Sequence, residues 1–269
     1  MEFSVGNATL FADSVTELEN QIYSILLFGG IALAPVIFAV LLWLPAPYGR
    51  YARRGWGLVV SRRNAWLLME APAVVVFAYF FLSGDLAGAN TAWIFFILWQ
   101  VHYLNRSIVY PLRMRDRGKT NPLLIVVLAM LFNLWNGYLN GRYIGVHAAD
   151  YALDWLYDPR FVIGLLIWLS GFFLNLHSDE ILLRLRKPGE TDYKIPFGGG
   201  YRFVSCPNYL GEVVEWTGFA ILTWSPAGLF FAMWTAANLI PRARMHHQWY
   251  IEKFPDYPGN RKAVIPFFY

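Results

Sequence analysis

The chain has 269 residues, of which 57% are hydrophobic, 18% aromatic and 15% charged, with a net charge of +4. Soluble domains carry about 25% charged and about 45–50% apolar residues, so this composition excludes an ordinary water-soluble enzyme and, through its aromatic content, a disordered chain. The single cysteine, Cys206, excludes an intrachain disulfide and a cysteine-only zinc site.

Seven apolar runs follow one another along the chain, at residues 21–45, 64–82, 91–112, 122–140, 160–183, 207–224 and 226–241. Each is close to the length of about 20 residues that a membrane span needs. Four acidic residues precede position 20, whereas a cleavable signal peptide begins with a basic segment. We therefore expect an all-α, polytopic membrane protein with seven transmembrane helices around an intramembrane cavity, as a single domain over residues 1–269.

The basic residues alternate from one connecting segment to the next. Nineteen of the 22 Lys and Arg residues follow the first, third, fifth and seventh runs. Because basic segments stay in the cytoplasm during insertion, the N-terminal segment 1–20 is predicted outside and the tail 242–269 inside. These residues recur at every predicted cytoplasmic turn and form no single patch, so nucleic-acid binding is not expected.

Polar groups interrupt the second and third runs at membrane depth. A charge there costs at least about 2.5–3.5 kcal/mol on insertion scales, so Glu70 is expected to face an interior or a cavity. Tyr103, Arg106 and Tyr110 are spaced i, i+3, i+7 and so share one helix face. A buried arginine needs an acidic or phosphate partner, and a structural Arg–Glu pair between helices is the alternative.

Polar stripes also lie at the end of the fifth and seventh runs and at the start of the sixth. They are predicted to contain Asn175, Asp179 and Arg186 in the fifth run, Asn208, Glu212 and Glu215 in the sixth, and Arg242, His246 and Tyr250 in the seventh. The two glutamates have no lysine nearby, so they need hydrogen-bond donors from other helices. Adjacent histidines such as His246 and His247 point about 100° apart on a helix, and no metal site is expected.

The predicted cytoplasmic segments are rich in Gly, Pro, Arg and Tyr. The Gly198–Gly200 run does not open a GxGxxG helix, so it is predicted to be a flexible lid and no Rossmann motif. Together the stripes predict a cavity whose arginine-rich cytoplasmic mouth suits an anionic, water-soluble cofactor. Its aromatic, apolar depth suits a lipid-soluble substrate, which is the arrangement of an enzyme more than of a channel.

Several ordered motifs accompany these stripes. They read Val101-His102-Tyr103-Leu104-Asn105-Arg106, Asn175-Leu176-His177-Ser178-Asp179, Leu185-Arg186-Lys187-Pro188-Gly189-Glu190, Asn208-Tyr209-Leu210-Gly211-Glu212-Val213-Val214-Glu215-Trp216 and Phe254-Pro255-Asp256-Tyr257-Pro258. In this order they resemble the steroid 5α-reductase family, from about residue 45 to the C-terminus and most closely the type 2 enzyme. The resemblance implies a seven-helix membrane fold, NADPH as the cofactor, and reduction of the Δ4 double bond of 3-oxo-Δ4-steroids.

The resemblance also implies roles for single residues. Glu70 and Tyr103 match the family's catalytic pair at the steroid 3-keto group, with Trp66 and Met69 as further substrate contacts. Met69 stands where the family often has glutamine, which removes one amide contact. The implied cofactor contacts are Arg106, Tyr110, Lys119, Asn175, Asp179, Arg186, Tyr193, Asn208, Glu212, His246 and Tyr250. Lys119 stands where an arginine is expected, and a lysine meets the cofactor 2′-phosphate as a point charge.

These residues lead to a hypothesis for the reaction. Tyr103, oriented with Glu70, hydrogen-bonds the ketone and stabilises the charge that develops as a hydride reaches C5; C4 is then protonated.

The alternatives to this function are reduction of another lipid enone or enoyl substrate, methylation with S-adenosylmethionine, and transport. The substrate is expected to enter from the bilayer, with no obligate protein partner. The expected location is a bacterial inner membrane, or the endoplasmic reticulum membrane if the source is eukaryotic.

Overall fold

The computed structural model of the chain describes residues 3–44, 57–86, 90–114, 118–187, 189–190 and 192–269, with side chains described from Thr16 onward. Pro188 of the quoted motif and parts of the basic segments, at 45–56 and 115–117, lie outside these residues. The long helices are α1 (Phe3–Trp43), α2 (Arg62–Leu82), α3 (Asn90–Leu104), α5 (Leu123–Val146), α6 (Pro159–Arg184), α7 (Pro207–Thr223) and α8 (Pro226–Lys253). Within the described residues, each predicted apolar run coincides with one of these helices, and the third run continues past the end of α3.

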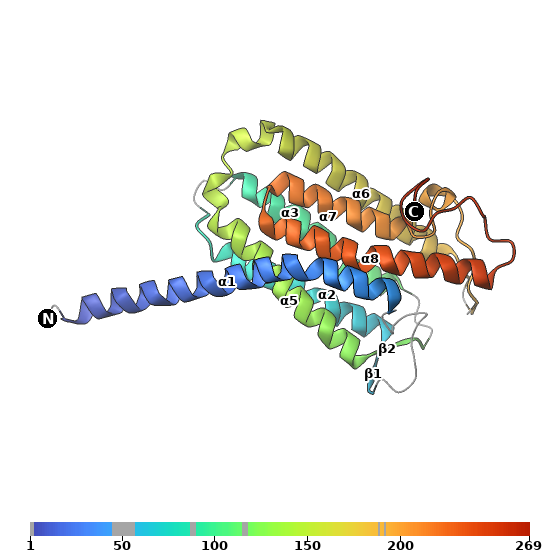
Figure 1. Cartoon of the computed structure of the whole chain (residues 1–269), viewed down its shortest axis with the longest axis horizontal. Helices are drawn as coiled ribbons and strands as arrows, with labels where there is room; N and C mark the ends of the chain where they lie inside the picture. Colours follow the sequence, from blue (N-terminus) through green and yellow to red (C-terminus); the bar gives the residue numbers. More distant parts are fainter. Residues whose placement is uncertain (1–2, 45–56, 87–89, 115–117, 188, 191) are drawn as a thin grey trace.

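The helices form one bundle in which both consecutive helices and helices distant in sequence lie side by side (Figure 1). α6 packs along α7, α2 packs along α5, and α8 lies between α7 and α1. The first part of α1 extends beyond the bundle at the end where the N-terminus lies, and the C-terminus lies at the opposite end. The short strands and the end of α8 share the C-terminal end of the bundle.

The third helical segment is not a regular α-helix throughout. α3 passes into a π-helical turn, η2 (Asn105–Val109), and then into α4 (Tyr110–Arg113). A π-helical turn inserts an extra residue into a helix, and such turns are frequent at functional sites. Arg106 lies in this turn and is buried, so the irregularity falls at the residue that the sequence marks as a buried charge.

A short sheet joins the starts of two helices. Strand β1 (Val59–Ser61) pairs antiparallel with β2 (Thr120–Pro122), and Ser61 lies opposite Thr120. The backbone N–H of Arg62 donates to the carbonyl of Lys119 at 2.9 Å. This pairing is a small departure from the predicted all-α fold, and it places Lys119 beside the first turn of α2.

Local sequence accounts for the helix boundaries. Ser61, Asp158 and Ser225 cap α2, α6 and α8 by accepting hydrogen bonds from backbone N–H groups in the first turn.

α8 continues to Lys253, past the apolar run that ends at 241, so the first part of the predicted tail 242–269 is helical. Helical hydrogen bonding does not require apolar side chains, and hydropathy therefore marks only the part of a helix that faces lipid.

Four helices are long and apolar enough to cross a membrane: Thr16–Trp43, Arg62–Leu82, Leu123–Val146 and Pro159–Arg184. Their outer faces expose large apolar side chains, among them Ile25 of α1 and Leu166 of α6, at 71% and 63% exposure. Water solvates such faces poorly, so the chain is an integral membrane protein. α3 and α7 are shorter, at 15 and 17 residues, and seven crossings with the N-terminus outside remain a prediction.

Aromatic side chains fill the centre of the bundle. Trp99 of α3 stacks on Phe77 of α2, with ring centroids 4.3 Å apart, and Trp216 of α7 lies 4.3 Å from Phe231 of α8. The Tyr103 ring lies 4.9 Å from Trp99. The phenol of Tyr103 therefore belongs to a rigid aromatic core in which few rotamers fit.

The segment after α8 folds back onto the segment before α7. Val204 forms a parallel bridge with Lys262, and the Ser205 N–H donates to the Lys262 carbonyl at 2.8 Å. The Ser205 hydroxyl also lies 2.6 Å from Nδ1 of His247 and 2.6 Å from the Tyr257 hydroxyl. Burial, together with the nearby Lys262, lowers the pKa of His247. A neutral imidazole is therefore favoured in this tie between the tail and the loop.

Glycines let α6 and α7 approach until their backbones touch. A Cβ on Gly171 would overlap the backbone nitrogen of Glu215, and a Cβ on Gly211 would lie 2.6 Å from the backbone nitrogen of Asn175. Gly164 and Gly218 continue this seam, which resembles the close contacts of small residues between membrane helices. Polar residues of both helices thereby come within hydrogen-bonding distance.

Replacing Gly171 with alanine should force α6 and α7 apart, because the new methyl group has no space. Overpacking of this kind costs about 1–3 kcal/mol, so the thermal unfolding midpoint in detergent should fall by several degrees. Gly29→Ala in α1 is the matched control, since a Cβ added to Gly29 would have no atom of the described residues within 4 Å. Equal midpoints for the two variants would contradict the close contact.

Candidate active site

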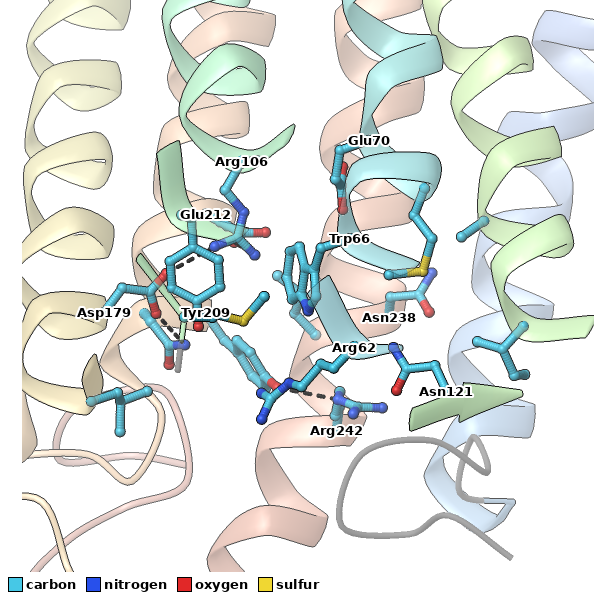
Figure 2. A pocket seen from close by; sticks show the side chains of 18 of the residues that line it. Arg62, Trp66, Glu70, Arg106, Asn121, Asp179, Tyr209, Glu212, Asn238 and Arg242 are labelled. Atoms are coloured by element: carbon cyan, nitrogen blue, oxygen red, sulfur yellow. Dashed lines mark hydrogen bonds and ion pairs between the residues drawn. The ribbon is translucent and has the colours of Figure 1, made fainter. Parts of the chain in front are cut away.

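One cavity of about 1000 Å³ opens among α2, α3, α5, α6, α7 and α8. This volume is at the upper end of the range of about 300–1,000 Å³ for ligand pockets. Figure 2 shows Trp66 and Glu70 of α2 on one side of the pocket, Asp179 and Glu212 on the other, and Arg106 near both. Seven Lys and Arg side chains line the cavity against three carboxylates, an excess that attracts an anionic ligand.

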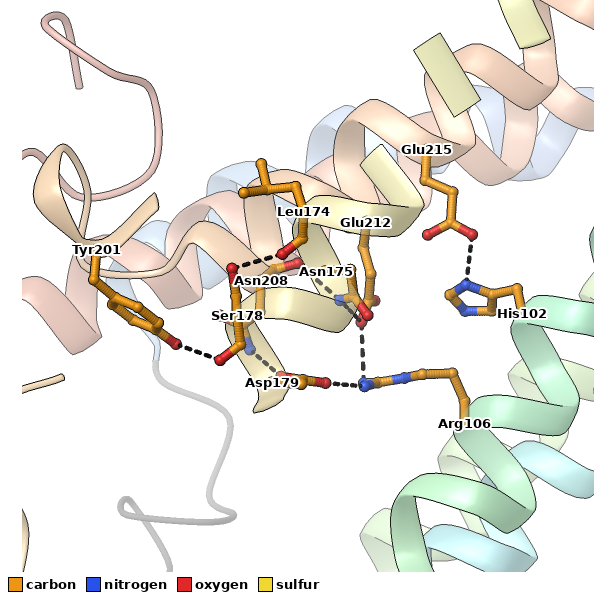
Figure 3. Close-up of polar contacts among 10 residues, drawn as sticks. All are labelled: His102, Arg106, Leu174, Asn175, Ser178, Asp179, Tyr201, Asn208, Glu212 and Glu215. Carbon is orange, nitrogen blue, oxygen red and sulfur yellow. Dashed lines mark hydrogen bonds and ion pairs between the residues drawn. The ribbon is translucent and has the colours of Figure 1, made fainter. Parts of the chain in front are cut away.

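Arg106 is neutralised inside the bundle by two carboxylates. Its Nη1 donates to Oδ2 of Asp179 at 2.8 Å, and its Nη2 lies 3.0 Å from Oε1 of Glu212 (Figure 3). The guanidinium also lies 4.5 Å from the ring centroid of Trp66 and 5.1 Å from that of Tyr110. The predicted alternative of an interhelical Arg–Glu pair is thus present, and Arg106 has its charge partners without a ligand.

Two amides donate further hydrogen bonds to these carboxylates. Asn208 donates to Oδ1 of Asp179 at 3.1 Å, and Asn175 donates both to the backbone carbonyl of Asn208 at 3.0 Å and to Oε1 of Glu212 at 3.2 Å. Asn175 is buried behind the wall and does not line the cavity. Asn175 is a predicted cofactor contact. In the structure it instead supports Glu212 and Asn208 from behind the cavity wall.

Glu215 lies one turn further along α7 and faces a different partner. Its Oε1 lies 2.7 Å from Nδ1 of His102, and the Glu215 side chain is fully buried. The expectation that both glutamates need donors from other helices is confirmed, because Glu212 meets Arg106 and Glu215 meets His102. His102 itself lines the cavity beside Tyr103.

Tyr103 and Glu70 lie on the same cavity but have no direct hydrogen bond between them among the contacts of the described residues. The Tyr103 hydroxyl donates to Oδ1 of Asn133 at 3.4 Å and accepts from Nδ2 of Asn136 at 3.2 Å. Nδ2 of Asn133 lies 3.3 Å from Oε2 of Glu70. The expected Tyr103–Glu70 pair is thus connected through an amide of α5.

Aromatic and cationic side chains meet at the mouth of the cavity. The Lys119 ammonium lies 4.7 Å from the ring centroid of Tyr193, and the Arg186 guanidinium lies 5.5 Å from the same centroid. The prediction that Arg186 continues a helical stripe is wrong, because α6 ends at Arg184 ahead of a Pro-Gly pair. Arg186 nevertheless reaches the cavity from the bend that follows.

The structure brings the predicted site residues together with the single exception of Asn175. The cavity is lined by Trp66, Met69, Glu70, Tyr103, Arg106, Tyr110, Lys119, Asp179, Arg186, Tyr193, Asn208, Glu212, His246 and Tyr250. Arg242 also lines it and donates to the Tyr209 hydroxyl at 3.1 Å. The polar stripe at the end of α8 therefore faces inward as predicted.

The sequence-based prediction does not include the polar residues of α5. Asn133, Asn136 and Asn140 are buried and spaced i, i+3, i+7 within the fourth apolar run. The signal is the one that marks the other helices, a row of polar side chains on one face of an apolar helix. Arg62 and Arg63 at the start of α2 also line the cavity, although the sequence marks them only as charges of a connecting segment.

Comparison with known proteins gives one consistent result. A family model described as 3-oxo-5-alpha-steroid 4-dehydrogenase matches residues 119–269. The 3-oxo-5-alpha-steroid 4-dehydrogenase 1 of Bos taurus is 46% identical over 88% of this chain and 93% of its own length. The enzyme of the same name from Homo sapiens is 42% identical over 93% and 97%. Steroid 5-alpha-reductase DET2 of Arabidopsis thaliana is 43% identical over 91% and 94%.

These three relatives are two type 1 enzymes and a plant protein. The expected closeness to the type 2 enzyme and the bacterial origin stay predictions.

Arg106→Leu should destabilise the protein strongly, because it leaves Asp179 and Glu212 buried without a cation. Breaking a buried pair from one side costs about 3–5 kcal/mol, measurable as a lower unfolding midpoint in detergent. Arg184→Leu is the control, since its pair with Glu180 involves a side chain that is 80% exposed and should contribute about 0–1 kcal/mol. A similar small loss in both variants would show that Arg106 does not hold the carboxylates.

Proposed function

We propose that this chain, which belongs to the 3-oxo-5-alpha-steroid 4-dehydrogenase family, reduces the Δ4 double bond of 3-oxo-Δ4-steroids to 5α-dihydrosteroids with NADPH. Its relatives are oxidoreductases that act on CH–CH bonds, and so is this enzyme. The observation that carries the finer proposal is a single cavity with a cationic mouth and with Tyr103 and Glu70 on its wall. A dinucleotide and an oily ketone need these two environments side by side.

The residues of the mouth fit a phosphate-bearing cofactor. Lysine and arginine side chains exceed carboxylates there, and Lys119 and Arg186 share the face of Tyr193. We propose that these two cations hold the 2′-phosphate side of NADPH, while Asn208 and Tyr250 line the path inward. NADPH, when bound, supplies the hydride for the reduction.

The inner part of the cavity fits an apolar substrate. Phe132 of α5, Trp216 of α7, and Phe231 and Trp234 of α8 line it, and Ile37 of α1 adds an aliphatic wall. Flat aromatic walls bury a rigid ring system with little entropy loss. A steroid nucleus is a substrate of this kind, and we propose that it lies between these side chains with its ketone toward Tyr103.

The chemistry proposed for this chain rests on Tyr103. Its hydroxyl donates a hydrogen bond to the carbonyl oxygen of the enone. As C5 accepts a hydride, the electron pair of the C4–C5 double bond shifts toward that oxygen, and the phenol stabilises the resulting enolate. C4 then takes up a proton, which restores the ketone. One such donor in a water-excluded site is worth about 2.7–4 kcal/mol.

Tyr103→Phe and Glu70→Gln should each lower the turnover of testosterone or progesterone by about 100-fold or more, because the first removes the oxyanion donor and the second weakens its support. NADPH binding should persist, since neither side chain belongs to the cationic mouth. The measurement is formation of 5α-dihydro product by purified, detergent-solubilised protein. Tyr79→Phe, at an exposed position on the outside of α2, is the control.

Wild-type turnover in both variants would refute the assigned roles. Absence of any 5α product from the unaltered protein would refute the proposed substrate, and trials with other lipid enones would follow. Protection from heat by S-adenosylmethionine instead of NADPH would favour the methyltransferase alternative.

Lys119→Ala should raise the KM for NADPH by about tenfold or more and leave the KM for NADH unchanged, because only NADPH carries the 2′-phosphate. A hydrogen bond to a charged group contributes about 1.5–3 kcal/mol. Lys253→Ala, an exposed cation at the end of α8 that lies off the cavity, is the control. An equal rise in the KM for NADPH and for NADH would show that Lys119 attracts both dinucleotides through its charge alone. Another cation would then contact the 2′-phosphate.

A further inference from the structure

A chain of directed hydrogen bonds runs along α5 to Glu70. Asn140 donates to Oδ1 of Asn136 at 3.0 Å, Asn136 donates to the Tyr103 hydroxyl at 3.2 Å, and Tyr103 donates to Oδ1 of Asn133 at 3.4 Å. Nδ2 of Asn133 then lies 3.3 Å from Oε2 of Glu70. The three asparagines are 6% exposed or less.

The orientation of the Asn133 amide follows from its strongest contact. Nδ2 of Asn133 lies 2.7 Å from the backbone carbonyl of Met69, and a carbonyl oxygen can only accept. The amide nitrogen must therefore face Met69 and Glu70, and the amide oxygen must face Tyr103. An amide oxygen only accepts, so the phenol proton of Tyr103 points toward Asn133.

The orientation of Asn136 is fixed from the other side. Nδ2 of Asn140 contacts both the backbone carbonyl and the side-chain oxygen of Asn136, at 3.2 and 3.0 Å. Asn136 must then present its nitrogen to the Tyr103 oxygen, which accepts while its proton goes to Asn133. Donation to a hydroxyl oxygen makes the O–H a stronger donor, because linked hydrogen bonds polarise one another.

Close packing of α2 on α5 places this chain of hydrogen bonds at the cavity. Gly137 and Gly141 of α5 lie against the backbone of Phe77, where a Cβ would have 3.1 and 2.5 Å to the nearest atom. The helices therefore meet without side chains between them near Tyr103, and Asn133 spans the space from α5 to the Met69–Glu70 peptide. Met69 itself provides no amide there.

We propose that Asn133 is the positioning residue of the active site, which joins Glu70 to Tyr103 and holds the phenol proton until a ketone replaces the Asn133 oxygen as its acceptor. This inference rests on the proposed function. The amide contacts no reacting atom in this role. It acts through Tyr103, and Asn136 supports the same phenol oxygen from behind.

A purely structural role makes a different prediction. If Asn133 only held α5 against α2, replacing any other buried amide that donates to an α2 carbonyl should have the same effect on activity and stability. Gln100 of α3 is such an amide, because its Nε2 donates to the Val74 carbonyl at 3.1 Å. Gln100 is 9% exposed and does not line the cavity, so it is a matched control.

The test compares Asn133→Leu with Gln100→Leu in the purified full chain. We expect Asn133→Leu to lower the single-turnover rate of steroid reduction by about 10- to 100-fold, the range for a group that orients a functional residue. The Kd for NADPH should stay within about threefold of the unaltered protein. Gln100→Leu should keep the rate and at most lower the unfolding midpoint.

A second measurement does not depend on turnover. With NADP⁺ present, the affinity for a Δ4-3-oxo steroid is compared with that for the same steroid without its 3-oxo group. The preference for the ketone should fall in Asn133→Leu and persist in Gln100→Leu, because only the former loses the oriented donor. If the leucine variant does not fold, Asn133→Ala removes the amide without added volume and gives the same comparison.

A rate and a ketone preference close to those of the unaltered protein in Asn133→Leu would overturn the inference while leaving the proposed function intact. Equal losses in Asn133→Leu and Gln100→Leu, accompanied by equal losses of stability, would also overturn it in favour of a structural role. If the unaltered protein reduces no Δ4-3-oxo steroid, the proposed function fails and this inference fails with it.

Discussion

A guanidinium inside an apolar helix bundle has to be neutralised by the protein itself, and the rest of the site depends on how Arg106 meets that requirement. Its partners Asp179 and Glu212 come from two other helices, so the ion network fixes η2, α6 and α7 relative to one another. Asn175 and Asn208 each donate a further hydrogen bond to one of these carboxylates. Arg106 therefore has its charge partners inside the protein, whereas Lys119 and Arg186 lie at the mouth of the cavity against Tyr193.

Polar networks of this kind form in a membrane only where helices approach closely. Gly171 and Gly211 bring α6 onto α7 beside Glu215 and Asn175, and Gly141 brings α5 onto the α2 backbone at Phe77. On both sides of the cavity a contact between helix backbones thus lies within a turn or two of the residues with chemical roles. The glycines allow the helix backbones to approach closely, and this approach positions the polar side chains of the site.

Much of this arrangement could be predicted from the sequence because membranes impose simple patterns. Apolar runs marked the helices, and Arg106, Glu212 and Tyr250 faced inward because charge and polarity avoid lipid. The π-helical turn at Arg106 could not be predicted, since no local composition separates it from an α-helical turn. Nor could the approach of Lys119 to α2, which depends on pairing between strands far apart in the sequence. The link between Tyr103 and Glu70 needed α2 and α5 to be placed side by side before Asn133 could be seen between them.

The pairing of Val204 with Lys262 has a consequence for biogenesis. The loop between α6 and α7 borders the candidate site, yet the partner that completes its backbone hydrogen bonding emerges from the ribosome only after α7 and α8 have been made. The helix bundle can therefore insert and pack before this loop is finished. The loop beside the candidate site is therefore completed late in folding, after the helices that frame the site are in place.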